Sequence, residues 1–225
     1  MKRIKTAIVG ASGYTGMELL RLLVNHPGVE LVAATSRQEA GKSLGTVFPR
    51  FRGAAGADLT FIEPDPDAIA ATGAEAAFLA LPHGVAADIA RALLDRGLRV
   101  IDLSADFRLS DPAVYQEFYE HAHPAPDLLE QAVYGLPEVR AEEISAANLI
   151  ASPGCYPTSI ILPLLPLLLC LGMLPARAEQ LFVAAPLTAK HSFTAGIEGP
   201  AVDAAGNVYA VNYGRQGTVG LRMEF

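Results

Sequence analysis

The sequence predicts an α/β fold built on a doubly wound parallel sheet. Apolar, β-branched runs of strand length alternate with helical patterns over the first half of the chain. The first run ends in a glycine turn that opens a helix, and 51% of the 225 residues are hydrophobic, which is enough to cover both faces of a sheet. Strands that alternate with helices pair in parallel, because each helix crosses back over the sheet.

Six segments carry the periodicity behind this prediction. Ile4–Val9 and Val29–Thr35 are apolar runs of strand length, and residues 14–25 between them place leucines at helical spacing. A glycine- and arginine-rich stretch at 41–56 is expected to be a loop. The pattern then resumes with a strand at 75–81, a helix at 85–96 and a strand at 99–103.

The chain changes character in its second half. Residues 110–148 are expected to be loop-rich, and they lead through a short strand at 149–151 to an apolar stretch at 160–174. That stretch contains two prolines and is shorter than the roughly 20 residues that span a bilayer, so we expect a buried helix with an irregular start. Short strands are expected near the end of the chain. We therefore divide the chain into domains at 1–150 and 151–225, with an atypical tail from about 180.

Composition narrows the classes of partner. Charged residues make up 18% of the chain, the formal net charge is -7 and no lysine or arginine cluster occurs, which argues against a nucleic acid or an anionic membrane as partner. A small diffusible substrate fits better. Two cysteines are too few for a disulfide framework, and no apolar secretory segment precedes the first strand, so the cytoplasm is the expected location.

A glycine-rich turn links the first strand to the first helix with the spacing GxxGxxG. Small residues there let the backbone approach a pyrophosphate, which free N–H groups and the helix N-terminus stabilise. This context predicts a Rossmann-type dinucleotide site, and the alternative is a glycine turn packed tightly against a helix. The predicted cofactor-binding residues of the turn are Gly10, Ser12, Gly13, Tyr14, Thr15 and Gly16.

Two further strand ends extend this site. The second strand is followed by Ser36 and Arg37, where an NAD site would carry an acidic residue. A cation and a hydroxyl there favour the 2′-phosphate of NADP, and the alternative is that Arg37 is a solvated loop residue. Pro82 and His83 follow the strand at 75–81, at the sheet edge where such folds bind ligands, although a lone histidine is also a common loop residue.

Cys155 is the candidate nucleophile. It follows Pro153 and Gly154 and precedes a helical apolar run, so we expect its sulfur near a helix N-terminus, which favours the thiolate form. A thiolate in that position suits covalent catalysis. The alternative is a structural buried cysteine, which is our interpretation of Cys170 within its leucine-rich run.

Ser104, Asp106 and Arg108 close the strand at 99–103 and are polar groups that could bind an anionic substrate, with Ser104 and Arg108 as the candidate ligands. For Arg108, a surface salt bridge to Asp106 or Asp111 is an equally open interpretation. His121 and His123 form a pair, but no further ligands occur at metal spacing, so we expect no metal site.

The sequence resembles the N-acetyl-gamma-glutamyl-phosphate reductases of arginine biosynthesis over its first ~175 residues, a length that one domain and part of a second would occupy. The glycine loop alone is shared with aspartate-semialdehyde dehydrogenases. The combination is specific, and the matching runs are Gly10–Glu18, Ala34–Arg37, Leu79–Gly84, Ile101–Arg108, Val133–Glu138 and Ser152–Thr158.

The resemblance implies an NADPH-dependent reduction of N-acetyl-glutamyl 5-phosphate to the semialdehyde, with phosphate released through a thioester on Cys155. Members of the family continue through a substrate domain whose His-Arg-His-x-Pro-Glu segment supplies a general acid/base. That segment is not found here, and His191 lacks its context. The expectation is a truncated α+β substrate domain with impaired activity, and the alternative is a non-catalytic NADP-binding remnant or a gene-fusion product.

The tail carries a second resemblance. Residues 196–209 are similar to the opening of a gluconolactonase-type β-propeller, in which Glu198 would match a metal-ligand position. One blade cannot build that site or bury its own apolar face, so the tail is assigned no activity. An uncovered apolar surface near 160–174 predicts self-association, and hence a homo-oligomer.

Overall fold

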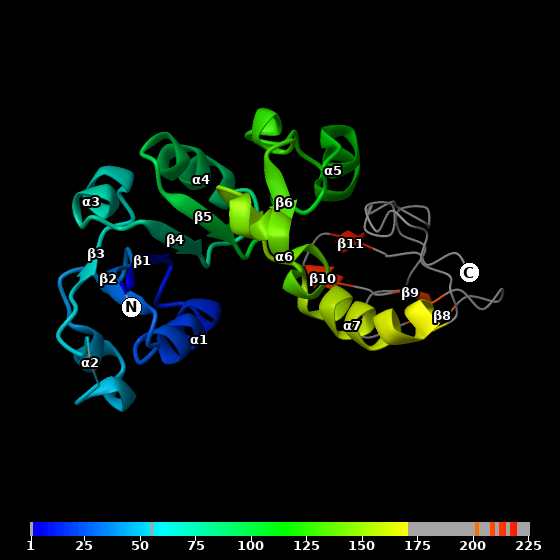
Figure 1. The fold of residues 1–225 in the computed structure, drawn as a ribbon. Coiled ribbons are helices and arrows are strands. Elements are labelled where there is room, and N and C mark those ends of the chain that lie inside the picture. Colours follow the sequence, from blue (N-terminus) through cyan, green and yellow to red (C-terminus); the bar gives the residue numbers. More distant parts are fainter. Residues whose placement is uncertain are drawn as a thin grey trace.

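A parallel sheet of seven strands organises the computed structural model, in the order β3-β2-β1-β4-β5-β7-β6 (Figure 1). The structure describes residues 2–54 and 56–170 and four short strands beyond them, with side chains described for 2–54 and 56–166. Every neighbouring pair in this sheet is parallel. The strands are β1 (Ile4–Val9), β2 (Val29–Thr35), β3 (Phe61–Ile62), β4 (Ala76–Leu79), β5 (Arg99–Asp102), β6 (Ala132–Tyr134) and β7 (Leu149–Ala151).

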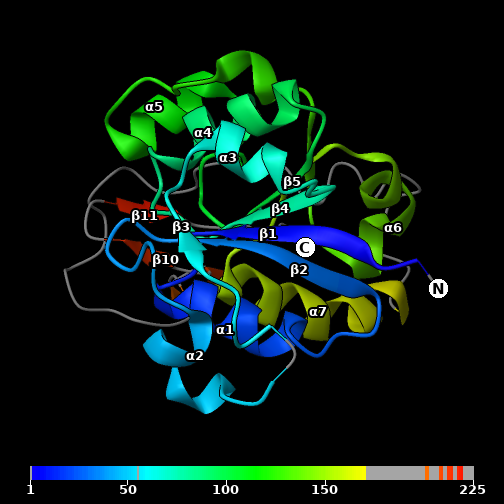
Figure 2. The same ribbon diagram turned by 90° about the vertical axis from the view of Figure 1, so that its left-hand side faces the viewer.

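Helices cover both faces of the sheet. Figure 2 shows α3, α4 and α5 on one face and α1, α2 and α7 on the other. The doubly wound α/β fold is therefore confirmed. The helices are α1 (Tyr14–Leu23), α2 (Leu44–Val47), α3 (Pro66–Ala71), α4 (Ala86–Asp95), α5 (Pro112–Tyr119), α6 (Pro137–Ala146) and α7 (Cys155–Cys170), with short 3₁₀ turns η1 (Pro49–Phe51) and η2 (Pro126–Leu128).

Alternation along β1 explains why helices lie on both faces. Ala7 and Val9 belong to the core beneath α3 and α4, whereas Ile8 belongs to the core beneath α1, and all three are fully buried. Successive side chains of a strand point to opposite faces, so a strand of consecutive apolar residues needs cover on both. The consecutive apolar residues at 7–9 of β1 are thus a local cause of the layered architecture.

The stretch at 41–56, expected to be a loop, is instead packed into the core beneath α1. It contains α2 and η1, whose Leu44 and Phe51 are buried beside Leu20 of α1. Phe51 and Phe61 both make edge-on ring contacts with Phe48. The prediction of a loop was wrong because these apolar residues are spaced irregularly between glycines and prolines, so neither a helical nor a strand period shows.

Residues 110–148 were also expected to be loop-rich, and that prediction was wrong in its main part. The segment contains α5, η2, the edge strand β6 and α6. α5 begins at Pro112, and the Asp111 side chain accepts a 2.7 Å hydrogen bond from the Ala113 backbone N–H. An aspartate followed by proline is a common start of a helix. The helix was not predicted because it is short and its apolar residues show only a weak helical period.

The helix α7 starts earlier than expected. It begins at Cys155 rather than near 160, with Pro157 in its first turn, where the missing N–H has no helical partner to lose. Of its described side chains, Ile161 is buried and Pro163 and Pro166 are exposed. Among the described helices, none is long and apolar enough to cross a membrane.

Short antiparallel strands occur in the tail, as expected. β8 (Ala201–Val202) pairs with β9 (Val208–Tyr209), and β10 (Asn212–Gly214) pairs with β11 (Gly217–Val219). The propeller resemblance rests on residues that include Glu198, which lies outside the described part of the chain, as does His191. The division of the chain at residue 150 stays a prediction.

We predict that the two glycines of the first turn differ in their tolerance of a side chain. A Cβ at Gly16 would meet the Gly10 carbonyl oxygen and lie 2.6 Å from the Ala11 Cα, whereas a Cβ at Gly13 would lie 3.6 Å from the nearest atom, the Gly10 oxygen. Gly16→Ala should lower the free energy of unfolding by about 2 kcal/mol or more. Gly13→Ala should lower it by less than about 1 kcal/mol. Urea denaturation measures both, and equal losses would contradict the packing argument.

Candidate functional site

The candidate site lies at the carboxyl edge of the sheet, where the strand order reverses. From β1 the chain proceeds through β2 to β3 on one side, and then returns to place β4 on the other side of β1. In open α/β sheets this reversal leaves a crevice at the carboxyl ends of the two central strands. The loops that follow β1 and β4 both begin there, and β5 and β7 continue the same edge toward Cys155.

Two glycines of the first loop are required by close packing. Gly10 has a φ of +83°, and a Cβ there would lie 2.5 Å from the Ala80 carbonyl oxygen. Gly16 is buried at the start of α1, where its missing side chain lets the helix contact the Gly10 backbone. Gly13, by contrast, is exposed and borders open space on its outer side. The glycine turn is therefore packed tightly against α1, as the alternative interpretation expects. The same turn also leaves the start of the helix exposed.

The N-terminus of α1 has no anion of its own. Its N-cap residue Gly13 makes no side-chain cap, and its first turn contains no acidic residue. Tyr14 is 89% exposed and Thr15 is also exposed. Free N–H groups at such a helix end stabilise a phosphate. The cradle formed by Gly10 and Gly16 therefore fits the pyrophosphate of a dinucleotide.

The end of β2 is tied to the glycine loop. The Ser12 and Ser36 hydroxyls are 2.8 Å apart, and the Gly10 N–H donates to the Thr35 Oγ1 at 3.2 Å. Ser36 is buried, and its Oγ accepts hydrogen bonds from the backbone N–H groups of Gln38 and Glu39. Arg37 is exposed and forms no ion pair with any described residue. Its guanidinium is thus available to an anion at this strand end.

The turn between β4 and α4 follows the strand next to β1. Pro82 and His83 are exposed there, and the His83 ring lies 5.5 Å from the ring of Tyr119. The Ala80 N–H donates to the Val9 carbonyl at 2.8 Å, which joins this turn to the end of β1. The structure therefore brings Pro82 and His83 to the same edge as the glycine loop.

Ser104 is buried and its hydroxyl is engaged within the protein. It donates to the Asp102 Oδ2 at 2.6 Å and accepts from the Asp106 N–H at 3.0 Å. Asp102 is itself fully buried, and burial raises its pKa to about 6 despite the hydrogen bonds from Ser104. The hydroxyl of Ser104, a predicted substrate ligand, thus already has two hydrogen-bond partners within the protein.

Arg108 joins the ends of β5 and β7. Its Nε donates to the Ser152 carbonyl and its Nη2 to the Leu103 carbonyl, both at 2.9 Å. The salt-bridge interpretation is not what the structure shows, since within the described residues neither Asp106 nor Asp111 pairs with it. The edge of the guanidinium that carries Nε is therefore used to hold the segment that leads to the cysteine.

Two partly buried tyrosines lie within electrostatic reach of Arg108. Burial raises the pKa of Tyr119 and of Tyr134, and the positive charge of Arg108 acts against that rise in both. α5 and β6 therefore each bring a phenol within electrostatic reach of the guanidinium. Sequence reasoning missed both tyrosines, although Tyr134 belongs to a run that carried the family resemblance.

Cys155 is a free thiol and the first residue of α7, and it is exposed. The expected place at a helix N-terminus is therefore observed, and the alternative of a buried structural cysteine is wrong. The Gly154 carbonyl just before it accepts from the Thr158 N–H at 3.1 Å and from the Thr158 hydroxyl at 3.0 Å. The first turn of α7 contains no acidic residue. The side chain of Cys170 lies outside the described part.

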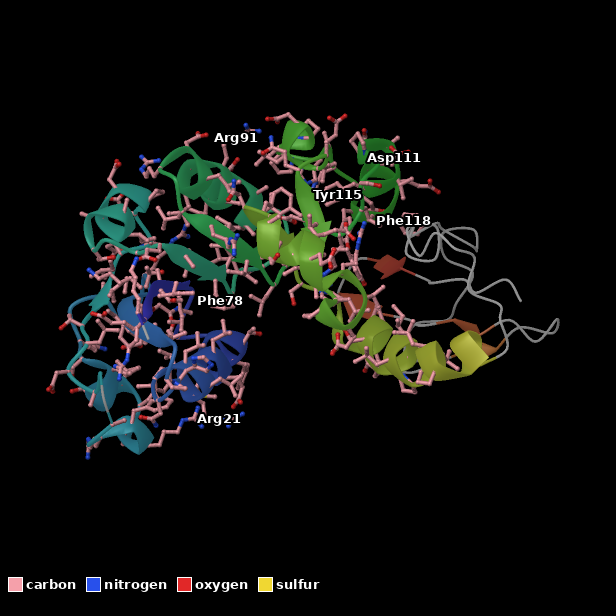
Figure 3. The ribbon with its side chains drawn as sticks, in the orientation of Figure 1. Arg21, Phe78, Arg91, Asp111, Tyr115 and Phe118 are labelled. Carbon is pink, nitrogen blue, oxygen red and sulfur yellow. The ribbon has the colours of Figure 1, made fainter. Side chains whose placement is uncertain are left out.

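Asp106, one of the polar residues after β5, makes contacts that the sequence did not predict. Its buried carboxylate accepts hydrogen bonds from the Gly84 N–H at 2.7 Å, the Ala87 N–H at 3.2 Å and the Tyr115 hydroxyl at 3.1 Å. Tyr115, labelled in Figure 3, comes from α5. Burial and the nearby charge of Asp106 raise the pKa of this phenol, which keeps it a hydrogen-bond donor.

The histidine pair is divided between the surface and the interior. His121 is exposed, whereas His123 is buried with its Nε2 2.8 Å from the Asp106 carbonyl and its Nδ1 accepting from the Ala125 N–H. Since Nδ1 accepts, Nε2 carries the proton and donates to that carbonyl. Both ring nitrogens of His123 are engaged, which leaves neither for a metal. Among the described residues, no group of three or more histidine, cysteine or acidic side chains is placed to hold one.

Comparison with known sequences places the chain in a family. The sequence model described as the semialdehyde dehydrogenase NAD-binding domain matches residues 5–147, more than half of the chain. A protein of Akkermansia muciniphila named N-acetyl-gamma-glutamyl-phosphate reductase is 66% identical over 167 residues, which cover 74% of this chain and 48% of that protein. One of the same name from Nitrosococcus oceani is 56% identical over 165 residues, with 73% and 47% covered. The chain thus spans about half the length of these relatives.

Comparison with solved structures supports the fold. The aspartate semialdehyde dehydrogenase of Candida albicans with NADP superposes with a TM-score of 0.53 at 22% identity, covering 76% of this chain and 48% of that one. The aspartate semialdehyde dehydrogenase II of Vibrio cholerae gives a TM-score of 0.53 at 20% identity, covering 74% and 47%.

The pKa of Asp102 predicts a pH dependence of stability with a definite sign. Its pKa of about 6 in the folded chain lies above the ordinary 3.8, so Asp102 contributes stability at low pH that is lost as the pH rises from about 4 to 6. The full difference corresponds to roughly 3 kcal/mol. In urea titrations, the free energy of unfolding of Asp102→Asn relative to wild type should rise by up to roughly that amount between pH 4 and 7.

Asp127→Asn is the matched control for this prediction. Asp127 is an exposed carboxylate whose pKa is lowered by its hydrogen bond to Arg91. The contribution of the Asp127 carboxylate to folding stability is lost on acidification. The free energy of unfolding of Asp127→Asn should therefore not rise relative to wild type as the pH increases. Parallel pH profiles of wild type and Asp102→Asn would contradict the assignment of a costly buried charge to Asp102.

Proposed function

The chain belongs to the semialdehyde dehydrogenase NAD-binding-domain family, and we propose that it binds NADPH and carries the thiol nucleophile of an N-acetyl-gamma-glutamyl-phosphate reductase. The observation that carries this proposal is the exposed Cys155 at the start of α7, on the same sheet edge as an open dinucleotide loop. β5 pairs with both β4 and β7, so one strand separates the cofactor crevice from the cysteine.

The proposed cofactor is NADP in its reduced form. Its pyrophosphate would lie at the start of α1 within Gly10–Gly16, and its 2′-phosphate would face Ser36 and Arg37. Pro82 and His83 would border it from the turn after β4. When bound, NADPH supplies the hydride that reduces an acyl group to an aldehyde.

The proposed role of Cys155 is to convert the substrate into a thioester. Its sulfur attacks the carbonyl carbon of an acyl phosphate, the carbon–oxygen bond to phosphate breaks, and the phosphate leaves with the bonding electrons. The N-terminal end of α7, whose first turn has no acidic residue, would stabilise the negative charge that develops on the substrate during this step. Arg108 is the proposed anion ligand, since its outer Nη1 makes no hydrogen bond to a described residue. Ser104 would then act through the loop it holds, because its hydroxyl is engaged.

The substrate that we propose is N-acetyl-glutamyl 5-phosphate. The support is the name of relatives that are 66% and 56% identical over the part that carries these residues. The reaction places the chain in arginine biosynthesis, and the cytoplasm is its proposed location. A homo-oligomer remains part of the proposal, on the ground of the apolar stretch at 160–174.

Arg37 should determine the choice of cofactor. We predict that Arg37→Ala weakens NADPH binding about tenfold, because one charge-assisted contact to the 2′-phosphate is lost, and changes NADH binding less than about twofold. Arg21→Ala is the control, because it removes an exposed arginine from the far end of α1 (Figure 3). Cofactor fluorescence gives both dissociation constants. Equal affinity of the wild-type chain for NADPH and NADH would refute the 2′-phosphate assignment.

Acylation of Cys155 tests the proposed chemistry. Addition of N-acetyl-glutamyl 5-phosphate should release about one equivalent of phosphate per chain and add one acyl group, visible in the intact mass. Cys155→Ser should abolish both signals and Cys170→Ser should retain them. Sustained NADPH oxidation separates a working reductase from a chain that binds the cofactor and is acylated once. A burst of equal size in Cys155→Ser would rule out the thiol as nucleophile.

A further inference from the structure

The Asp106 carboxylate connects three segments of the chain. Of its three hydrogen bonds, one comes from Gly84 in the turn before α4, one from Ala87 in the first turn of α4 and one from Tyr115 of α5. The N-cap residue of α4, Val85, makes no side-chain cap. Asp106 is therefore the cap of α4, supplied from a distant part of the sequence rather than from the helix itself.

The backbone of Asp106 is fixed as firmly as its side chain. Its N–H donates to the Ser104 Oγ at 3.0 Å, and its carbonyl accepts from the His123 Nε2 at 2.8 Å. Asp106 and Tyr115 are fully buried and His123 is 6% exposed. A buried carboxylate with three donors and a restrained backbone has no alternative position, because each lost bond would leave a buried polar group unpaired.

The turn that Asp106 holds is in direct contact with the glycine loop. Gly84 has a φ of +78°, and its N–H is the one that Asp106 binds at the shortest distance, 2.7 Å. The same turn begins at Ala80, whose carbonyl oxygen would lie 2.5 Å from a Cβ at Gly10. With so little space between them, a shift of this turn displaces the glycine loop as well.

The carboxylate also distinguishes the two helix ends that begin at the crevice. The N-terminus of α4 faces Asp106 and carries Asp88 in its first turn, so its positive end is already neutralised. The N-terminus of α1 has neither a side-chain cap nor an acidic residue. Only α1, of these two helices, therefore offers unoccupied N–H groups to a phosphate.

We propose that Asp106 is a positioning residue for the dinucleotide: by capping α4 it fixes the turn from Ala80 to Gly84 against the glycine loop and directs the pyrophosphate to α1. This inference rests on the proposed binding of NADPH. Asp106 touches neither the cofactor nor the substrate in this scheme, and its effect passes through the Gly84 N–H and the turn.

Asp106→Asn tests the proposal. Asparagine keeps the shape of the side chain, removes the charge and sets an N–H₂ group against a backbone donor. The variant should bind NADPH about tenfold more weakly, at a temperature where it is fully folded. Adenosine 2′-monophosphate, which lacks the pyrophosphate and the nicotinamide, should lose less than about twofold by calorimetry, because the Arg37 end of the site is not held by Asp106.

Asp111→Asn is the matched control. Asp111 caps α5 through the Ala113 N–H, so the same chemical change removes a charge from a helix N-terminus and leaves a capping oxygen in place. It should lower the free energy of unfolding by less than about 1 kcal/mol and leave NADPH affinity unchanged. Asp106→Ser, which retains one capping oxygen, provides a second variant at the proposed position.

The outcomes separate this inference from the proposed function. A wild-type chain that does not bind NADPH would refute the proposed function itself. Wild-type binding with an unchanged affinity in Asp106→Asn would refute only the positioning role. Equal losses for NADPH and adenosine 2′-monophosphate, or failure of both Asp106 variants to fold, would show a general structural role and overturn the inference.

Discussion

The close approach of the Gly10 backbone to the end of β4 is the constraint on which the carboxyl edge depends. No side chain fits between Gly10 and the Ala80 carbonyl, and none fits between Gly16 and the Gly10 carbonyl. α1 therefore lies directly against the loop that precedes it, with its N–H groups at the surface of the crevice. A larger residue at either position would separate helix, loop and β4, and the proposed phosphate-binding loop would lose its geometry.

Burial of carboxylates beside this edge is a cost that the fold offsets with hydrogen bonds. Asp102 and Asp106 are both fully buried, and burial together with the nearby charge of Asp106 disfavours the ionisation of Asp102. Asp106 receives three hydrogen bonds, whereas Asp102 receives two, both from Ser104. Asp106, with donors from three segments, therefore holds neighbouring parts of the chain together, whereas the two hydrogen bonds to Asp102 do not offset the burial that raises its pKa.

Sequence reasoning succeeded where the determining contacts are local. The glycine loop lies between a strand and a helix that are adjacent in the chain, and the position of Cys155 follows from the helix that begins there. It failed for Asp106, whose partner Gly84 is 22 residues away, and for the fork of Arg108, whose partner Ser152 is 44 residues away. No local period records such pairings, because the sheet alone brings those strand ends together.

The distribution of carboxylates over the helix N-termini ties the architecture to the chemistry. Among the described helices of eight or more residues, α4, α5 and α6 each have an acidic side chain at the N-terminus, namely Asp106, Asp111 and Glu138. α1 and α7 have none. These two helices begin at the glycine loop and at Cys155, where the proposed reaction requires a pyrophosphate and a thiolate. A helix N-terminus that already has a carboxylate is poorly suited to bind a further anion, and the two N-termini without one are those that the proposed chemistry uses.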